Sequence, residues 1–129
     1  MIVDDNTAFR NALKFMLEKR TLYKVVVEAE NGIQAIEKLS EIIPDLVLMD
    51  IEMPELNGID ATKIMLRKFS HIKCIALTMY KEAVYLNGLV EAGFKAFVYK
   101  PEIMKQLFVV IEAVMNDEFI SPIDLKMKE

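Results

Sequence analysis

The chain has 129 residues and a formal net charge of −4, and its length suits a single domain. Hydrophobic residues make up 53% of it, which favours strands buried on both faces. The negative charge argues weakly against direct nucleic-acid binding, and the lone Cys74 excludes an internal disulfide. No apolar run approaches the roughly 20 residues of a membrane span and no signal peptide is evident, so we expect a cytoplasmic protein without membrane contact.

Short β-rich runs alternate with longer segments that have helical spacing. The predicted strands lie at 2–3, 23–29, 45–50, 72–78 and 95–99. The segments that follow them repeat apolar residues every three or four positions: Phe9, Ala12, Leu13, Met16 and Leu17; Ile36, Leu39 and Ile43; Ala61, Ile64 and Met65; Leu86, Leu89 and Val90; and Ile103, Leu107, Val110, Ile111 and Val114. Strands that alternate with five helices predict an α/β protein with a parallel sheet covered by helices on both faces.

The C-terminal end has a different character from the rest of the chain. After Met115 the periodicity is lost, and the sequence contains Ser121-Pro122 and mixed charges. We therefore expect one domain at 1–116, followed at 117–129 by a linker or C-terminal tail.

Polar residues stand where the predicted strands end. Asp4 and Asp5 follow the first strand, Asp50 and Thr78 end the third and fourth, and Lys100 follows the fifth. In an open parallel α/β sheet, ligands bind in the crevice outside the carboxyl ends of the strands. These five side chains are thus expected to converge on one edge of the sheet.

The converging residues suit phosphoryl chemistry with Mg²⁺. This ion prefers oxygen ligands and is commonly held by one or two carboxylates, for which Asp5 and Asp50 are candidates. A carboxylate can also attack phosphorus to form an aspartyl phosphate, provided that the negative charge of the phosphoryl group is neutralised. Lys100 and the metal ion would supply positive charge, and Thr78 could donate a hydrogen bond to a phosphoryl oxygen.

The ordered set of motifs resembles the receiver domain of bacterial two-component response regulators. The set consists of DD at 4–5, the D..MP...G pattern from Asp50 to Gly58, the threonine at 78 and KP at 100–101. The resemblance covers residues 1 to about 116 and implies a doubly wound, flavodoxin-like sheet of order 2-1-3-4-5. It also implies that Asp50 is the phosphoacceptor, that Thr78 and Lys100 contact the phosphoryl group, and that the protein is regulatory rather than an enzyme.

The resemblance assigns further roles near these residues. Asp4 and Asp5 would form the acidic pocket for Mg²⁺, and the backbone carbonyl of Glu52 would add a metal ligand. Phe97 matches the aromatic switch position that responds to phosphorylation together with Thr78. Met79, where many relatives have a smaller residue, is expected to leave the Phe97 ring less room to turn inward.

Similar receivers usually have a cis peptide bond before the proline that follows the lysine, which predicts a cis Lys100–Pro101 bond. The side chains of Glu52 and Tyr80 would lie where similar receivers vary and where the lifetime of the phosphoryl group is tuned.

Two alternatives remain at this point. Haloacid-dehalogenase-like phosphatases also phosphorylate an aspartate at a strand end, but they carry D-x-D after the first strand, whereas Asp4 and Asp5 are adjacent. A stand-alone receiver that acts through protein contacts is the other alternative. The segment 114–122 resembles the end of receivers that continue into a LuxR-type helix-turn-helix domain, which favours transcription as the output. The implied partners are a histidine kinase or phosphotransfer protein, a second copy after phosphorylation, and DNA only through an output domain.

Overall fold

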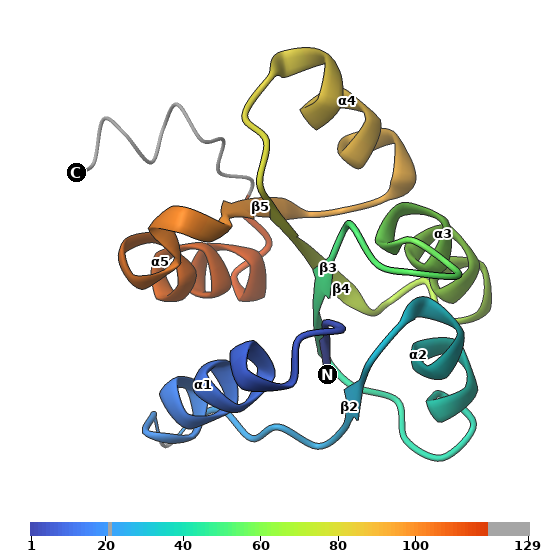
Figure 1. The fold of residues 1–129 in the computed structure, drawn as a ribbon, viewed down its shortest axis with the longest axis horizontal. Helices are drawn as coiled ribbons and strands as arrows, with labels where there is room; N and C mark the ends of the chain where they lie inside the picture. The colour runs from blue at the N-terminus through green and yellow to red at the C-terminus, as the bar shows by residue number, and fades with distance from the viewer. Residues whose placement is uncertain (21, 119–129) are drawn as a thin grey trace.

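The computed structural model describes residues 1–20 and 22–118, and it contains an α/β sandwich of three layers (Figure 1). Five parallel strands form one sheet in the order β2-β1-β3-β4-β5, as predicted. The elements in chain order are β1 Ile2–Val3, α1 Thr7–Glu18, β2 Glu28–Ala29, α2 Gly32–Lys38, β3 Leu46–Asp50, α3 Gly58–Lys68, β4 Lys73–Thr78, α4 Ala83–Ala92, β5 Ala96–Tyr99, a 3₁₀ turn Lys100–Glu102 and α5 Ile103–Met115.

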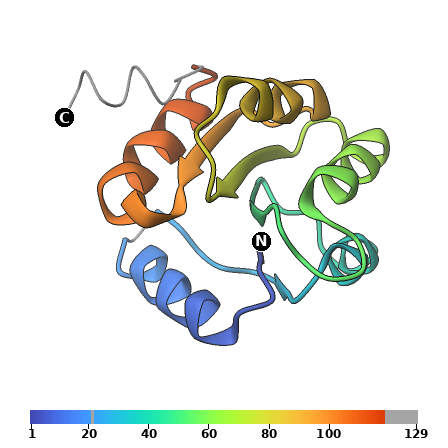
Figure 2. The same ribbon diagram turned by 45° about the horizontal axis from the view of Figure 1, so that its top comes forward.

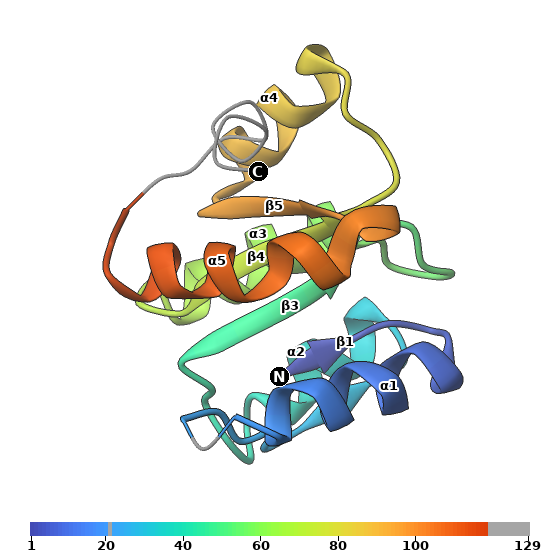
Figure 3. The same cartoon turned by 90° about the vertical axis from the view of Figure 1, so that its left-hand side faces the viewer.

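The helices cover both faces of the sheet. Helices α1 and α5 lie side by side on one face, whereas α2, α3 and α4 cover the other (Figures 2 and 3). Strand β4, which lies between β3 and β5, shows why the chain is so apolar. Its side chains alternate between the two cores, with Cys74 and Ala76 in one and Ile75 and Leu77 in the other. A strand buried on both faces needs hydrophobic residues at every position.

Three helices begin at an asparagine whose side chain caps the first turn. Asn6, Asn31 and Asn57 each accept a hydrogen bond from the backbone N–H three residues later, and these bonds satisfy donors that the helix itself leaves open. Two of these caps belong to the Asn-Gly pairs of the sequence, so what reads locally as a turn is here the start of a helix. Among the described residues, no helix has the length and apolar character to span a membrane.

Strands β3, β4 and β5 each begin one residue later than predicted, and two other elements are shorter by several residues. Strand β2 covers only residues 28–29 of the expected 23–29, because a parallel ladder needs a neighbour and β1 provides only two paired residues. Helix α2 ends at Lys38, so Ile43 lies outside it and is exposed. Pro44 disfavours a helical backbone at the residue before it, which opposes any extension to that point.

Lys73, at the first residue of β4, binds the end of the last helix. Its ammonium group donates to the carbonyls of Val114 and Met115 at 3.2 and 3.4 Å and lies 2.8 Å from the carboxylate of Asp117. A cation at a helix C-terminus satisfies carbonyls that have no intrahelical partner. The end of α5 is therefore attached to the edge of the sheet at which β4 begins.

Candidate functional site

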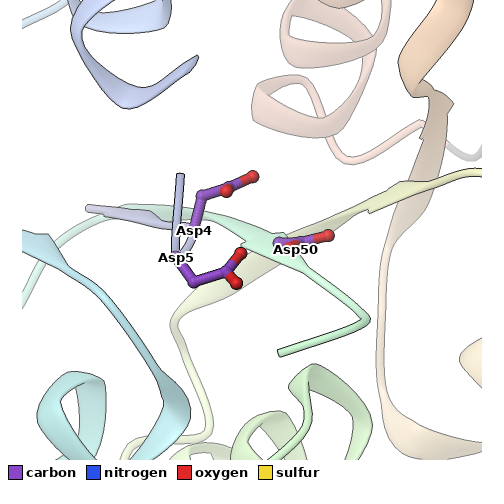
Figure 4. Close-up of side chains that lie close together, drawn as sticks. All are labelled: Asp4, Asp5 and Asp50. Carbon is purple, nitrogen blue, oxygen red and sulfur yellow. The ribbon is translucent and has the colours of Figure 1, made fainter. Parts of the chain in front are cut away.

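Three carboxylates meet at the carboxyl ends of β1 and β3. Asp4 and Asp5 follow β1 directly, and Asp50 is the last residue of β3 (Figure 4). One carboxylate oxygen from each lies within 4.8 Å of the others. Asp4 is fully buried and Asp50 is 6% exposed, whereas Asp5 faces solvent. These distances fit a small cation bound by hard oxygen ligands, and the exposed Asp5 leaves it an entry path.

Lys100 supplies the positive charge at this edge. Its Nζ lies 2.7 Å from Asp4 Oδ2 and 3.3 Å from Asp50 Oδ1, and it also lies over the ring of Phe9, 4.4 Å from the centroid. Burial lowers the pKa of Lys100, but the hydrogen bond to Asp4 and the charge of Asp50 outweigh this, so the pKa lies above its ordinary value. Lys100 therefore stays charged.

One ammonium group does not neutralise three neighbouring acids. Burial, reinforced by the charge of Asp4, raises the pKa of Asp50 to about 6, although Lys100 opposes the shift. An ionised Asp50 is therefore electrostatically disfavoured in the metal-free site, and an added cation would favour its charged form. The donor set thus suits a divalent cation.

Gly58 explains the spacing of the D..MP...G pattern. Its backbone N–H donates to the carbonyl of Ile51 at 3.0 Å, which brings the start of α3 against the end of β3. A Cβ atom at this position would lie 2.2 Å from the backbone oxygen of Asp50. Only glycine permits this approach, so the residue helps to set the position of the Asp50 backbone.

Thr78 and Phe97 lie where the sequence predicts, on adjacent strands. Thr78 is 3% exposed, and its hydroxyl accepts a hydrogen bond from the backbone N–H of Tyr80 at 3.1 Å. Phe97 is buried in the core shared with α2, α3 and α4. Met79 is about half exposed while Phe97 already lies in the core, and the expected restriction of the Phe97 ring by Met79 stays a prediction.

The predicted cis peptide bond before Pro101 is wrong, because the Lys100–Pro101 bond is trans. The proline lies in the first positions of the 3₁₀ turn Lys100–Glu102, where a missing N–H costs nothing. Lys100 reaches both buried carboxylates from this turn without a cis bend.

Two residues near the site were missed by the sequence reasoning. Arg10 is buried, and its guanidinium group contacts the backbone of Asp4. The sequence could have indicated this residue, because Arg10 is a charged residue at a position that the helical spacing places on the buried face of α1, with Leu13 and Leu17. Tyr85 on α4 has a buried hydroxyl close to the Thr78 side chain. Burial raises the pKa of Tyr85, with the Thr78 side chain opposing the shift. No sequence pattern signals this contact.

The side chains of Glu52 and Tyr80 lie together at the surface beside the acids. Both are exposed, and the neighbouring Glu52 carboxylate raises the pKa of the Tyr80 hydroxyl. Glu52 also lines an open depression of about 450 Å³ together with Tyr85. The metal-binding role of the Glu52 carbonyl stays a prediction.

The amino-acid sequence is similar to one family of known proteins. A family model described as the response regulator receiver domain matches residues 1–112. The chain is 37% identical over 116 residues to the chemotaxis protein CheY of Bacillus subtilis, which covers 90% of this chain and 96% of that protein. It is 33% identical over 125 residues to the transcriptional regulatory protein YdfI of the same species, which covers 97% of this chain but 58% of that protein.

The fold agrees with solved structures. A LuxR-family two-component response regulator from Aurantimonas sp. SI85-9A1 is 29% identical and superposes with a TM-score of 0.89, which covers 98% of this chain and 91% of that one. The chain spans about half the length of several curated transcriptional regulators that it matches.

Proposed function

The chain belongs to the response regulator receiver domain family, and we propose that it is a signalling domain that accepts a phosphoryl group on Asp50. The observation that carries this proposal is the position of the Lys100 ammonium group between Asp4 and Asp50, beside the acid cluster. The donor would be a histidine kinase or a phosphotransfer protein. The protein would be regulatory rather than a turnover enzyme.

The proposed chemistry is a phosphoryl transfer between nucleophiles. An oxygen of ionised Asp50 forms a bond to phosphorus while the bond between phosphorus and the donor breaks, and the donor keeps that electron pair. Mg²⁺ held by Asp5, Asp50 and the Glu52 carbonyl, with Asp4 in the acidic pocket, would neutralise charge on the phosphoryl oxygens. Lys100 would neutralise further charge there, since its ion pairs with Asp4 and Asp50 already hold its ammonium group at the acid cluster.

Thr78 and Phe97 are proposed to report the phosphorylated state. The Thr78 hydroxyl accepts from the Tyr80 N–H in this conformation. A hydroxyl can accept one hydrogen bond and donate another, so Thr78 could donate its proton to a phosphoryl oxygen by turning towards it, and the neighbouring Phe97 would move with it. The new charge thereby shifts a balance between two arrangements of the β4–α4 segment.

The output is proposed to be transcription. YdfI is named a transcriptional regulatory protein, and this chain matches 58% of its length. Residues 117–129 would then lead from the receiver, 1–116, towards an output domain that binds DNA, and phosphorylation would favour a homodimer. Most of this segment, 119–129, lies outside the described residues. The cytoplasmic location stays a prediction.

The direct test uses acetyl phosphate as the donor, with and without Mg²⁺, and measures the intact mass of the protein. We expect one phosphoryl group per chain, dependent on Mg²⁺ and absent from Asp50→Asn. Asp45→Asn is the matched control, because Asp45 is exposed and directly precedes the same strand, at the end opposite to Asp50. Undiminished incorporation in Asp50→Asn would refute the assignment. Repeated turnover of an aryl phosphate would favour the phosphatase alternative.

A further inference from the structure

Arg10 lies on the face of α1 that packs against the sheet. The buried residues of this helix are Arg10, Leu13 and Leu17, which share one face at helical spacing. Arg10 is only 8% exposed. A guanidinium group is rarely buried this deeply unless it is paired, because removal of its charge from water is costly. Its partners therefore indicate what it does.

The Arg10 guanidinium group connects the ends of two strands. Its Nη1 donates to the backbone carbonyl of Asp4 at 2.5 Å, and its Nη2 donates to Thr7 Oγ1 at 3.4 Å. Its Nε lies 3.5 Å from Glu28 Oε1, and its Nη2 lies 3.9 Å from Glu30 Oε1. The end of β1 is thereby attached to the end of β2 through one rigid, planar group.

The carbonyl that Arg10 binds belongs to the peptide unit between Asp4 and Asp5. A peptide unit is planar, so a fixed carbonyl also fixes the direction in which the next residue leaves it. The next residue is Asp5, the exposed member of the acid cluster and a candidate metal ligand. The turn is also held by the Asp4 N–H, which donates to the Ala29 carbonyl at 3.1 Å, and by Asp4 Oδ1, which accepts from the Asn6 N–H at 2.8 Å, but Arg10 is the side chain that binds the Asp4 carbonyl itself.

We propose that Arg10 is a positioning residue for the Mg²⁺ site: it holds the Asp4–Asp5 turn so that the carboxylates face one cation. This inference rests on the proposed function, in which Mg²⁺ binds at this cluster. Residues that orient metal ligands typically contribute about 10- to 100-fold to metal affinity.

The positioning role and simple electrostatics predict opposite changes in Mg²⁺ affinity when Arg10 is replaced. A positive charge near a cation site repels the cation, so loss of the Arg10 charge alone would tighten Mg²⁺ binding. Loss of the restraint on Asp5 would weaken it. Lysine at position 10 separates the two effects, because it keeps the charge but lacks the planar fork that donates to the Asp4 carbonyl while it lies beside the Glu28 and Glu30 carboxylates.

The experiment measures Mg²⁺ affinity by isothermal titration calorimetry in the absence of any phosphoryl donor, together with the unfolding temperature in EDTA. Arg10→Met and Arg10→Lys are compared with Lys14→Met. Lys14 is the matched control because it is on the same helix and pairs with the same Glu28 at 3.8 Å, yet no described contact joins it to the acid turn. Asp5→Asn shows the loss expected when a ligand is removed.

We expect both Arg10 variants to bind Mg²⁺ about tenfold or more weakly than the wild type, and Lys14→Met to stay within about twofold. Wild-type affinity in Arg10→Lys, tighter binding in Arg10→Met, an equal loss in Lys14→Met, or no Mg²⁺ binding by the wild type would each overturn the inference. If Arg10→Met does not fold in EDTA, Arg10→Lys decides the question. Failure of Asp50 to accept a phosphoryl group would count against the proposed function alone, since no donor is present in the titration.

Discussion

Replacement of Asp50 by asparagine is expected to stabilise the metal-free protein at neutral pH. Asp50 is held beside Asp4, and its pKa is raised from 3.8 to about 6, chiefly by burial. Between these two values the folded protein binds a proton that the unfolded chain releases. The metal-free wild type therefore loses stability as the pH rises from about 4 to about 6, and above pH 6 the full destabilisation caused by ionised Asp50 is present.

The size of the effect follows from the shift. About two pKa units at 1.4 kcal/mol each correspond to about 3 kcal/mol at most. Solvent at the open edge of the sheet screens part of this cost, so we expect Asp50→Asn to raise the free energy of unfolding by about 1 to 3 kcal/mol at pH 7.5. At pH 4.5 folded Asp50 is already protonated, so the stability gain of Asp50→Asn over the wild type should be less than about half of its value at pH 7.5.

Urea denaturation followed by circular dichroism in EDTA, at both pH values, measures this difference. Glu91→Gln is the control, because it removes the same charge from an exposed position on α4. We expect no comparable gain from it. An Asp50→Asn variant that is less stable than the wild type at pH 7.5, or whose advantage is the same at both pH values, would refute the electrostatic reasoning.

Three further substitutions test the surroundings of the acids. Gly58→Ala places a Cβ atom 2.2 Å from the Asp50 backbone oxygen and should lower the free energy of unfolding, measured by urea denaturation, by about 1 to 3 kcal/mol. Gly88→Ala is its control: the new Cβ meets no atom within 4 Å, so the free energy of unfolding should rise by about 0.5 to 1 kcal/mol. Equal effects of the two substitutions would contradict the packing argument. Lys100→Met leaves the buried acids without their cation, so its unfolding temperature should fall at pH 7.5. At pH 5 the unfolding temperature should recover partly, because Asp50 takes up a proton. An unfolding temperature that falls equally at both pH values would count against this explanation. Asn57→Ala removes the cap of α3 and should lower the free energy of unfolding by about 0.5 to 2 kcal/mol, and an unchanged value would mean that this cap contributes nothing.

The sequence predicted most of the sheet and the convergence of the site because both depend on local signals. The run that ends at Asp50 is apolar without interruption, and a parallel sheet brings the ends of its strands to one edge. The length of β2 was not predictable in this way, since it depends on how far the distant β1 extends. The cis bond at Pro101 came from resemblance alone, and the local 3₁₀ turn accommodates the trans form.

The supporting contacts of the site were the part that sequence could not provide. Arg10 is recognisable afterwards as a charge in an apolar stripe, but its partners come from two other segments, Asp4 after β1 and Glu28 and Glu30 at β2. The hydroxyl of Tyr85 approaches Thr78 only because α4 packs against the end of β4. Such contacts depend on the tertiary arrangement rather than on periodicity or spacing.

Strand β4 spans the molecule between Thr78 at the acid-lined edge and Lys73 at the opposite edge. Five residue steps of about 3.3 Å place these two positions about 17 Å apart along a strand that is paired on both sides. Such a strand is stiff along its axis, so an axial shift at Thr78 would be passed to Lys73, whereas a rotation of the Thr78 side chain would stay at its own edge. Lys73 holds Asp117, and an axial shift of β4 would therefore move the point at which the chain leaves α5.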